Sequence, residues 1–194
     1  PVAIIDIDDA SLARIGQWPW PRNILAQMVD SLQVGNPAAI GFDIVFSEED
    51  RTSPKNILSL WWQPKNLEHL IKDLPDHDVV FSKALENSNS VTGFVLTAEK
   101  GTNAPKSKAG FSYAGIDPKP YLQGFDGAVS SLSVFENVAQ GNGALNSSPD
   151  SDGVIRRTSL VLTEGGRFYP SLSFEALRVA QGASGYIIKS TGAS

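Results

Sequence analysis

Residues 2–9 constrain the fold of this chain more than any other stretch. They read Val-Ala-Ile-Ile-Asp-Ile-Asp-Asp, an apolar run that leads into the carboxylates of Asp6, Asp8 and Asp9. Because the run alternates little, we expect residues 2–7 to form a strand buried on both faces, as strands of parallel sheets are. In an open α/β sheet, such a strand presents polar groups at its carboxyl end. The run therefore predicts either a ligand-binding module or a metal-assisted hydrolase.

A helix and a second strand are predicted to follow. Residues 22–34 carry apolar side chains at helical spacing, Pro21 suits a first helical position, and Gly35 followed by Asn-Pro ends the helix. Residues 38–46 form another apolar run. A strand, a helix and a strand of these lengths predict a right-handed βαβ unit with parallel strands.

The acidic residues of these two strands are the first candidates for a ligand site. Neighbouring parallel strands bring their carboxyl ends to one edge of a sheet, so we expect Asp43 to lie near Asp6 or Asp8. Acids so close to buried strands are costly unless they are paired, and Arg22 and Arg156 are the expected partners. The candidate ligand-binding residues are Asp6, Asp8, Asp9, Arg22, Asp43 and Arg156. The alternative reading of the same acids is structural, as helix caps or ion-pair partners.

The remaining pattern predicts a long polar loop, a helix, a strand, an irregular hairpin, a short helix, a short strand, a closing hairpin and a last helix. Their approximate ranges are residues 47–76, 76–86, 91–96, 110–125, 133–136, 143–146, 154–169 and 171–181. A basic tip is expected at 100–108, and 186–188 is either an edge strand or the start of a connector. We predict a single α/β domain with a largely parallel or mixed central sheet, flanking helices and an antiparallel C-terminal hairpin.

Four further residues are predicted to have structural roles. Trp18 and Trp20 flank a proline at a helix entrance, where tryptophans usually serve as packing anchors. Pro21 begins the helix, and Gly153 belongs to a turn. Asp150 and Asp152 lie beside that turn, but the pattern lacks the other ligands of a calcium loop.

Composition excludes several classes of function. The net charge of −5 argues against a nucleic-acid partner, because such a partner requires a basic face. The absence of cysteine excludes disulfides, thiolate metal sites and cysteine nucleophiles. The two histidines, His69 and His77, lie in no metal or triad motif and are expected at the surface. No apolar run approaches the about 18 residues that cross a bilayer. The chain begins at Pro1, so we expect it to be a fragment of a longer protein.

Five blocks of sequence, in order, resemble the type-two CHASE domain, an extracellular sensory domain. They are Ile-Ile-Asp-Ile-Asp-Asp-Ala-Ser-Leu at 4–12, Gly-Gln-Trp-Pro-Trp-Pro-Arg at 16–22, Gly-Phe-Asp-Ile-Val-Phe-Ser-Glu at 41–48 with Asp50, Gly-Ala-Leu-Asn at 143–146 with Pro-Asp-Ser-Asp-Gly-Val-Ile-Arg-Arg at 149–157, and Tyr-Pro-Ser-Leu at 169–172. Residues 51–130 carry little of the pattern. The resemblance thus implies one sensory domain over residues 1–194, with a variable insertion around 51–130.

The resemblance also implies a setting and a partner list. The domain is expected in the periplasmic or extracellular portion of a bacterial inner-membrane protein, between transmembrane helices. Its output would be a cytoplasmic kinase or nucleotide cyclase of the same chain, as in two-component systems and cyclases. It implies no cofactor and no catalysis. The ligand is expected to be a small molecule or a protein, and a homodimer is possible.

Two alternatives remain at this point. Asp6 and Asp8 resemble the first motif of haloacid-dehalogenase-type phosphatases, which would make the chain an Mg²⁺-dependent phosphohydrolase. That chemistry needs a lysine and later acids, and the sequence shows no matching motif for them. The other alternative is a dimerisation scaffold without a ligand.

Overall fold

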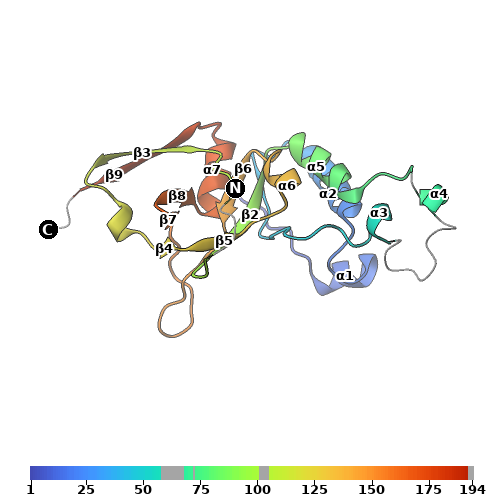
Figure 1. The fold of residues 1–194 in the computed structure, drawn as a ribbon, viewed down its shortest axis with the longest axis horizontal. Helices are drawn as coiled ribbons and strands as arrows, with labels where there is room; N and C mark the ends of the chain where they lie inside the picture. Colours follow the sequence, from blue (N-terminus) through green and yellow to red (C-terminus); the bar gives the residue numbers. More distant parts are fainter. Residues whose placement is uncertain (58–67, 72, 101–104, 192–194) are drawn as a thin grey trace.

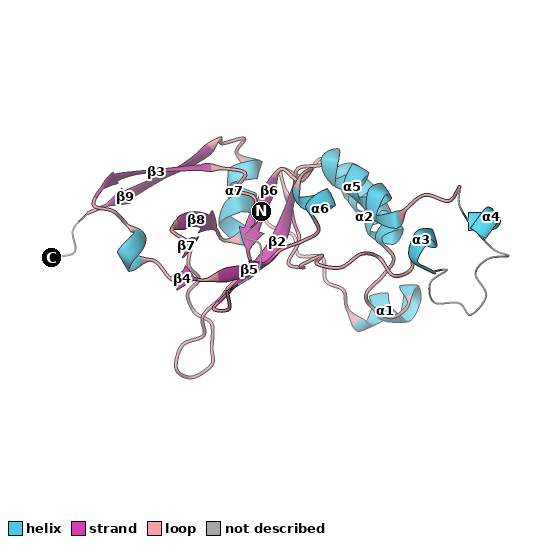
Figure 2. Cartoon of the chain, in the orientation of Figure 1, coloured by secondary structure: helices cyan, strands magenta, loops and turns pink. Residues whose placement is uncertain are grey.

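The molecule is long in one direction, with most of its helices at one end and most of its strands at the other (Figures 1 and 2). The computed structural model describes residues 1–57, 68–71, 73–100 and 105–191. The architecture is mixed α/β, with parallel and antiparallel strands, which confirms the predicted fold class.

The described residues form short helices and strands in the following order. The helices are α1 (Asp9–Ile15), α2 (Arg22–Gln33), α3 (Pro54–Ile57), α4 (Glu68–Ile71), α5 (His77–Glu86), α6 (Ser133–Glu136) and α7 (Leu172–Ala180), with a 3₁₀ turn at Lys119–Tyr121. The strands are β1 (Ile40–Gly41), β2 (Ser90–Thr97), β3 (Gly110–Gly115), β4 (Gly124–Phe125), β5 (Gly127–Val129), β6 (Gly141–Ala144), β7 (Val161–Glu164), β8 (Arg167–Pro170) and β9 (Gly185–Ser190).

Strand β2 is the centre of the main sheet. It runs parallel to β1 and β6 and antiparallel to β5. Its mostly buried side chains explain the apolar run in the sequence. The chain from β1 to β2 passes through α5, a crossover of the kind that parallel strands require. Gly93 lies where Cβ would come within 2.8 Å of the carbonyl oxygens of Phe42 and Ile44, so only glycine lets these backbones approach.

Four phenylalanines form the core beneath the helices. Phe42, Phe46, Phe81 and Phe135 meet edge to face, with ring centroids 5.1–5.9 Å apart. Leu25 and Val29 of α2 complete this core from the other side. A second core lies under α7 and the β7–β8 hairpin and includes Phe94, Leu96, Leu162 and Tyr169.

The predicted first strand is wrong. Residues 2–7 form no strand, and Val2 and Ile4 are 93% and 90% exposed. A strand needs a neighbour for its backbone hydrogen bonds, and within the described residues nothing pairs with this segment. The βαβ unit built on it is therefore absent. The second predicted strand, residues 38–46, is shortened to β1, because Phe42 and Phe46 turn into the aromatic core. The strand that was expected to begin at residue 154 begins only at Val161.

Other predicted elements are confirmed. Helix α2 occupies 22–33, α5 follows its cap at Asp76, and α7 follows Ser171. The hairpin through Gly165 and Gly166 joins β7 to β8. The uncertain segment 186–188 lies in β9, which pairs in parallel with β3 as a two-stranded ribbon (Figure 1). The tryptophan pair at 61–62 and the centre of the basic tip, 101–104, lie outside the described residues.

Candidate ligand-binding pocket

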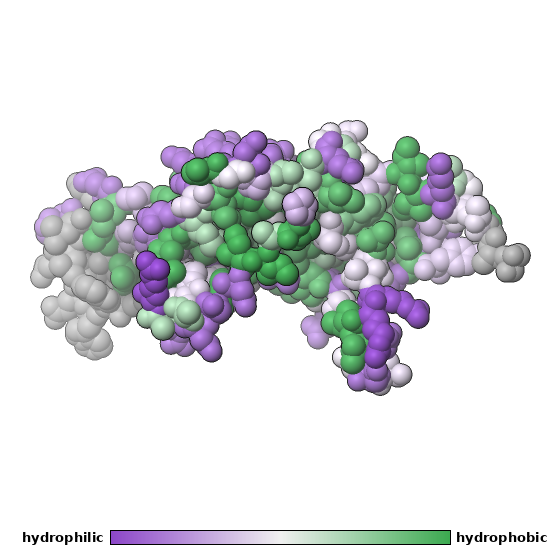
Figure 3. Space-filling model, turned by 180° about the vertical axis from the view of Figure 1, so that it is seen from behind, coloured by the Kyte–Doolittle hydropathy of each residue, from purple (hydrophilic) through white to green (hydrophobic). Residues whose placement is uncertain are grey.

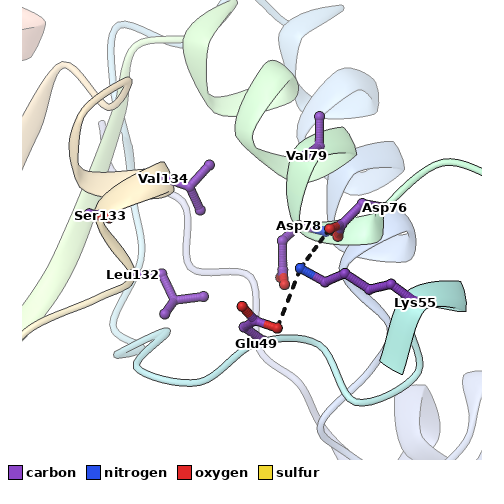
Figure 4. A pocket seen from close by; sticks show the side chains of 8 residues that line it. All are labelled: Glu49, Lys55, Asp76, Asp78, Val79, Leu132, Ser133 and Val134. Atoms are coloured by element: carbon purple, nitrogen blue, oxygen red, sulfur yellow. Dashed lines mark hydrogen bonds and ion pairs between the residues drawn. The ribbon is translucent and has the colours of Figure 1, made fainter. Parts of the chain in front are cut away.

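A cavity of about 220 Å³ lies between α3, α5, α6 and the segment that follows β1 (Figure 4). Its polar lining comes from one side and its apolar lining mainly from the other. The lining residues are Glu49, Lys55, Asp76, Asp78, Val79, Leu132, Ser133 and Val134. We call this cavity the acidic pocket, because three of its four charged side chains are carboxylates.

Lys55 of α3 spans the polar side of the acidic pocket. Its Nζ lies 2.7 Å from Asp76 Oδ2 and 3.3 Å from Glu49 Oε2. The hydrogen bond to Asp76 is the main reason why the pKa of Lys55 is raised above its usual value. Both Lys55 and Glu49 are well exposed, with side-chain exposures of 44% and 58%, so these contacts can exchange with solvent.

Asp78 lies deeper, in the first turn of α5. It is only 4% exposed. Its Oδ2 accepts a hydrogen bond from the backbone N–H of Asp50 at 3.0 Å, whereas Oδ1 accepts none. The nearest cation to Oδ1 is Arg22 Nε at 3.8 Å, beyond hydrogen-bond reach. Burial raises the pKa of Asp78, and the neighbouring Asp76 and Asp50 carboxylates add to this effect.

Behind Asp78, Asp50 gathers several donors. Its carboxylate accepts from the backbone N–H of Arg22 at 2.7 Å and from Thr52 N and Oγ1 at 2.8 and 2.7 Å. His77 Nδ1 lies 3.1 Å from the same carboxylate. Burial on its own would raise the pKa of Asp50, but these hydrogen bonds outweigh it and hold the pKa below the usual value. The Arg22 guanidinium lies 4.6 Å from the centre of the Phe46 ring, which anchors the cluster to the aromatic core.

Local sequence explains why these groups meet. Asp76 caps α5 by accepting from Asp78 N, as an N-cap aspartate does. Ser53, just before α3, donates to Asp76 Oδ1 at 3.1 Å and accepts from His77 N at 3.0 Å. These bonds hold the start of α3 against the start of α5, and Asp50 reaches the start of α2. Three helix N-termini therefore share one group of carboxylates, which suits their partial positive charge.

With this geometry in place, comparison with known proteins identifies the family. A family model described as the CHASE2 domain matches residues 1–192. This chain belongs to the CHASE2 domain family. CHASE2 domains are extracellular sensory domains of receptors. Neither the curated proteins nor the solved structures contain a significant match. Among the described residues of this CHASE2 domain, no helix has the length and apolar character to cross a membrane.

The structure separates the predicted site residues of this CHASE2 domain. Arg22 lies beside the acidic pocket, but its carboxylate contacts are Asp50 and Asp78. Asp6, Asp9 and Asp43 are exposed. Asp8 caps α1 and accepts from Ser11 N and Oγ, and this pairing lowers its pKa. Arg156 bonds to Asp150 and Asp152 in an exposed turn. The predicted pairing of Arg22 and Arg156 with the strand-end acids is thus replaced by these other contacts.

The four residues predicted to have structural roles lie as follows. Trp20 is buried, its Nε1 donates to Gly16 O at 2.7 Å, and Trp18 meets it edge to face. Pro21 is the N-cap of α2, one position before the first helical residue that was predicted for it. Gly153 occupies the turn with a φ of 81°, in the region that favours glycine.

Most of the acidic pocket was missed from the sequence. Glu49, Asp50 and Lys55 lie in the segment that we expected to be a loop, and Asp76 and Asp78 were predicted only as helix caps. Two signals were available. A long loop inside a domain is usually functional, and two aspartates at one helix start are more than a cap requires.

The residues of the acidic pocket are not those of the phosphohydrolase alternative, which uses Asp6 and Asp8. Within the described parts of the chain, no group of three acidic, histidine or cysteine side chains is arranged to hold a metal. The phosphohydrolase alternative needs Asp6 and Asp8 at the end of a strand, and the structure places both outside any strand. CHASE2 domains are sensory and not catalytic, which fits a domain that binds.

Proposed function

We propose that this CHASE2 domain is the input module of a bacterial transmembrane receptor and that the acidic pocket receives its ligand. Binding there would be transmitted to the ends of the domain and on to a cytoplasmic kinase or nucleotide cyclase. The domain would lie in the periplasm or outside the cell, held between membrane helices. The observation that carries this proposal is a bonded path from the pocket to the last strand.

The path begins at the wall of the acidic pocket. Leu132 and Val134 line the pocket at α6, and the chain continues from α6 to Gln140 at the start of β6. The carbonyl oxygen of Gln140 accepts from Arg178 Nη2 at 2.8 Å. A displacement of α6 by a ligand would therefore reach α7 through one short loop and one charge-assisted hydrogen bond.

The path ends on β9. Arg178 Nη1 donates to Ala183 O at 2.8 Å, just before β9. Arg178 also pairs with Glu175, which accepts a 2.5 Å hydrogen bond from the Tyr186 hydroxyl in β9. These bonds connect α7 to β9, so a shift of α7 would be passed on to β9. A contiguous path supports coupling without measuring it, so the proposal needs a functional test.

The test breaks the mechanical connection beyond β9. A flexible glycine–serine linker inserted after Thr191 in the receptor that carries this domain should reduce its signalling output. Output is measured as autophosphorylation or second-messenger synthesis. A ligand biases output only through its differential affinity for two arrangements of the ends, and a slack linker decouples them. The insertion is placed after Thr191 so that β9 stays intact; an insertion at Gly185 would fall on the first residue of that strand.

The matched control places the same linker after Ser147, in an exposed coil. This variant should signal normally, and both variants should keep the thermal stability of the unmodified domain. Unchanged output from the Thr191 variant would overturn the proposal.

A homodimer is a second proposal, with its own observation. Large hydrophobic side chains stay exposed, including Val2, Ile4, Ile155 and Ile187, and hydrophobic surface extends across the middle of one face (Figure 3). Exposed apolar surface of this kind often marks an association site. Light scattering coupled to size exclusion tests it. A monomer at every concentration up to the millimolar range would contradict it.

A further inference from the structure

We propose that the acidic pocket binds a small aliphatic primary amine. The ligand ammonium would bond to Asp78 Oδ1 and Glu49, and its carbon chain would lie against Val79, Leu132 and Val134. This inference rests on the proposed function only in taking the pocket as the ligand site, and it goes further by assigning the chemical class of the ligand.

The charge balance of the pocket favours a cation. Glu49, Asp76 and Asp78 line it, opposed by the single ammonium of Lys55. Arg22 lies behind, between Asp78 and Asp50, so these four carboxylates are opposed by the two cations Lys55 and Arg22. An anionic ligand would meet this excess of carboxylates at close range and be repelled. A cationic ligand would be attracted by the same carboxylates to a similar extent.

Asp78 supplies an acceptor with no hydrogen bond. Its Oδ1 is shielded from solvent and has no hydrogen-bond partner within the described residues, while its side chain points into the pocket (Figure 4). The nearby Arg22 Nε, at 3.8 Å, is too far to hydrogen-bond it. A buried acceptor without a hydrogen bond costs free energy, and a ligand N–H that reaches it would remove this cost. Because the partner would be a carboxylate, the new bond is charge-assisted and among the stronger kinds.

Lys55 shows that the pocket accommodates an ammonium group. Its Nζ already bridges Asp76 and Glu49 across the mouth. The Lys55 side chain is partly exposed and extends from a helix of only four residues, so it can withdraw at small cost. A free amine can then replace or join it, and it can reach Asp78.

The size and the apolar wall limit the rest of the ligand. Ligand pockets for drug-sized molecules commonly span about 300–1,000 Å³, and this cavity of about 220 Å³ is smaller. Val79, Leu132 and Val134 offer methyl groups to the non-polar part. A linear amine of a few carbons matches both limits, whereas a nucleotide or an extended peptide exceeds them.

The experiment titrates the purified 194-residue chain calorimetrically with 1-aminobutane, with butyrate and 1-butanol as matched probes. The amine should bind saturably, and the acid and the alcohol should not. Asp78→Asn should weaken amine binding about tenfold or more, since one charge-assisted hydrogen bond corresponds to at least that factor. Lys55→Met should tighten it several-fold, because it frees Glu49 and Asp76.

Two further variants keep the test decisive. Glu49→Gln changes an exposed side chain, so it should fold normally and weaken binding even if Asp78→Asn fails to fold. Glu86→Gln, at the opposite end of α5, is the control and should leave the affinity unchanged. The proposal is overturned if neither the unmodified chain nor Lys55→Met binds 1-aminobutane, or if Glu49→Gln and the folded Asp78→Asn variant bind it as tightly as the unmodified chain. Binding without any effect on receptor output would instead count against the proposed function and leave the amine site standing.

Discussion

Two buried clusters in this molecule each combine an arginine with carboxylates, and they are built differently. At the strand-rich end, Glu175 is 1% exposed and pairs with Arg178 through bonds of 2.9 and 2.8 Å, while Tyr186 donates to it at 2.5 Å. At the helical end, Arg22 Nε and Asp78 Oδ1 face each other at 3.8 Å, and neither makes a hydrogen bond to any residue that the structure describes. We call the first group, Glu175, Arg178 and Tyr186, the closed cluster, because its hydrogen bonds are all made. We call the second group, Arg22, Asp50 and Asp78, the open cluster, because two of its facing atoms lack a hydrogen bond.

The difference separates a structural connection from the proposed binding site. A buried network with every donor and acceptor satisfied rigidifies its elements, here α7 and β9. A buried network with open groups retains unused interaction energy that a ligand can recover. The raised pKa of Tyr186 agrees with a fully hydrogen-bonded cluster, since burial and the hydrogen bond to Glu175 both raise it. The predictions below ask how far this contrast holds.

Breaking the closed cluster should have the largest effect. Arg178→Met keeps the aliphatic stem but leaves Glu175 as an uncompensated buried charge, a change that usually costs about 3–5 kcal/mol of unfolding free energy. It also removes the donors to Gln140 and Ala183. Urea denaturation followed by circular dichroism gives the value.

Arg157→Met is the matched control for that variant. Arg157 is exposed, so its replacement should leave the unfolding midpoint unchanged. A loss below about 1 kcal/mol in Arg178→Met would mean that the closed cluster contributes no more than a surface ion pair does.

A smaller loss is expected at Asp50, the satisfied part of the open cluster. Asp50→Asn weakens its hydrogen bonds from Arg22 and Thr52 and should cost about 1–3 kcal/mol at neutral pH. The folded pKa of Asp50 lies below the ordinary 3.8, so this stabilisation is present above pH 3.8 and is lost as the pH falls through the folded value. Denaturation curves from pH 3 to 7 should show the wild-type and variant stabilities converge at the acidic end. A constant difference would contradict this assignment.

Asp78, the open part of the same cluster, should respond in the opposite direction. The pKa of Asp78 in the folded protein is raised. Its contribution to the free energy of unfolding is therefore fully present below pH 3.8 and is lost as the pH rises through the folded pKa. Asp78→Asn remains neutral and can still accept from Asp50 N–H. It should therefore match the wild type in acid and be equally or more stable at pH 7, by up to about 1 kcal/mol. A loss at pH 7 as large as that of Asp50→Asn would mean that both acids are structural and that the pocket is closed.

The sequence predicted the parts of the fold that depend on local signals. Helix α5 follows from its Asp76 cap and its apolar spacing, and the β7–β8 hairpin follows from its two glycines. Strand β2 follows from a run that is apolar on both faces. These elements carry their own caps, turns or continuous burial, so their assignment needed no knowledge of their neighbours.

Residues 2–7 show where this reasoning fails. Their apolar run matches that of β2, but pairing depends on a neighbour that no local pattern specifies. The acidic pocket was missed for the same reason. Glu49, Lys55 and Asp78 are separated in the chain and are brought together by the hydrogen bonds of Ser53 that join the starts of α3 and α5. The sequence analysis did predict Arg22 as an ion-pair residue, because acids next to buried strands need a cation, but the acids that Arg22 contacts are Asp50 and Asp78 and not the strand-end acids.

The smallest effect is expected at Arg156, a predicted site residue that the structure places away from both clusters. It makes bonds of 2.7–3.0 Å to Asp150 and Asp152, more direct than any contact of Arg22 with Asp78. These groups are half exposed, however, so water and salt screen the attraction, and the side chains lose entropy when they are held in place. Arg156→Ala should therefore have the same melting temperature as the wild type, both at low salt and at high salt. A clear drop in melting temperature would show that the turn around Gly153 packs against another surface, and it would return Arg156 to the list of functional residues. No drop would show that the short distances between Arg156 and its two acids do not by themselves stabilise this fold.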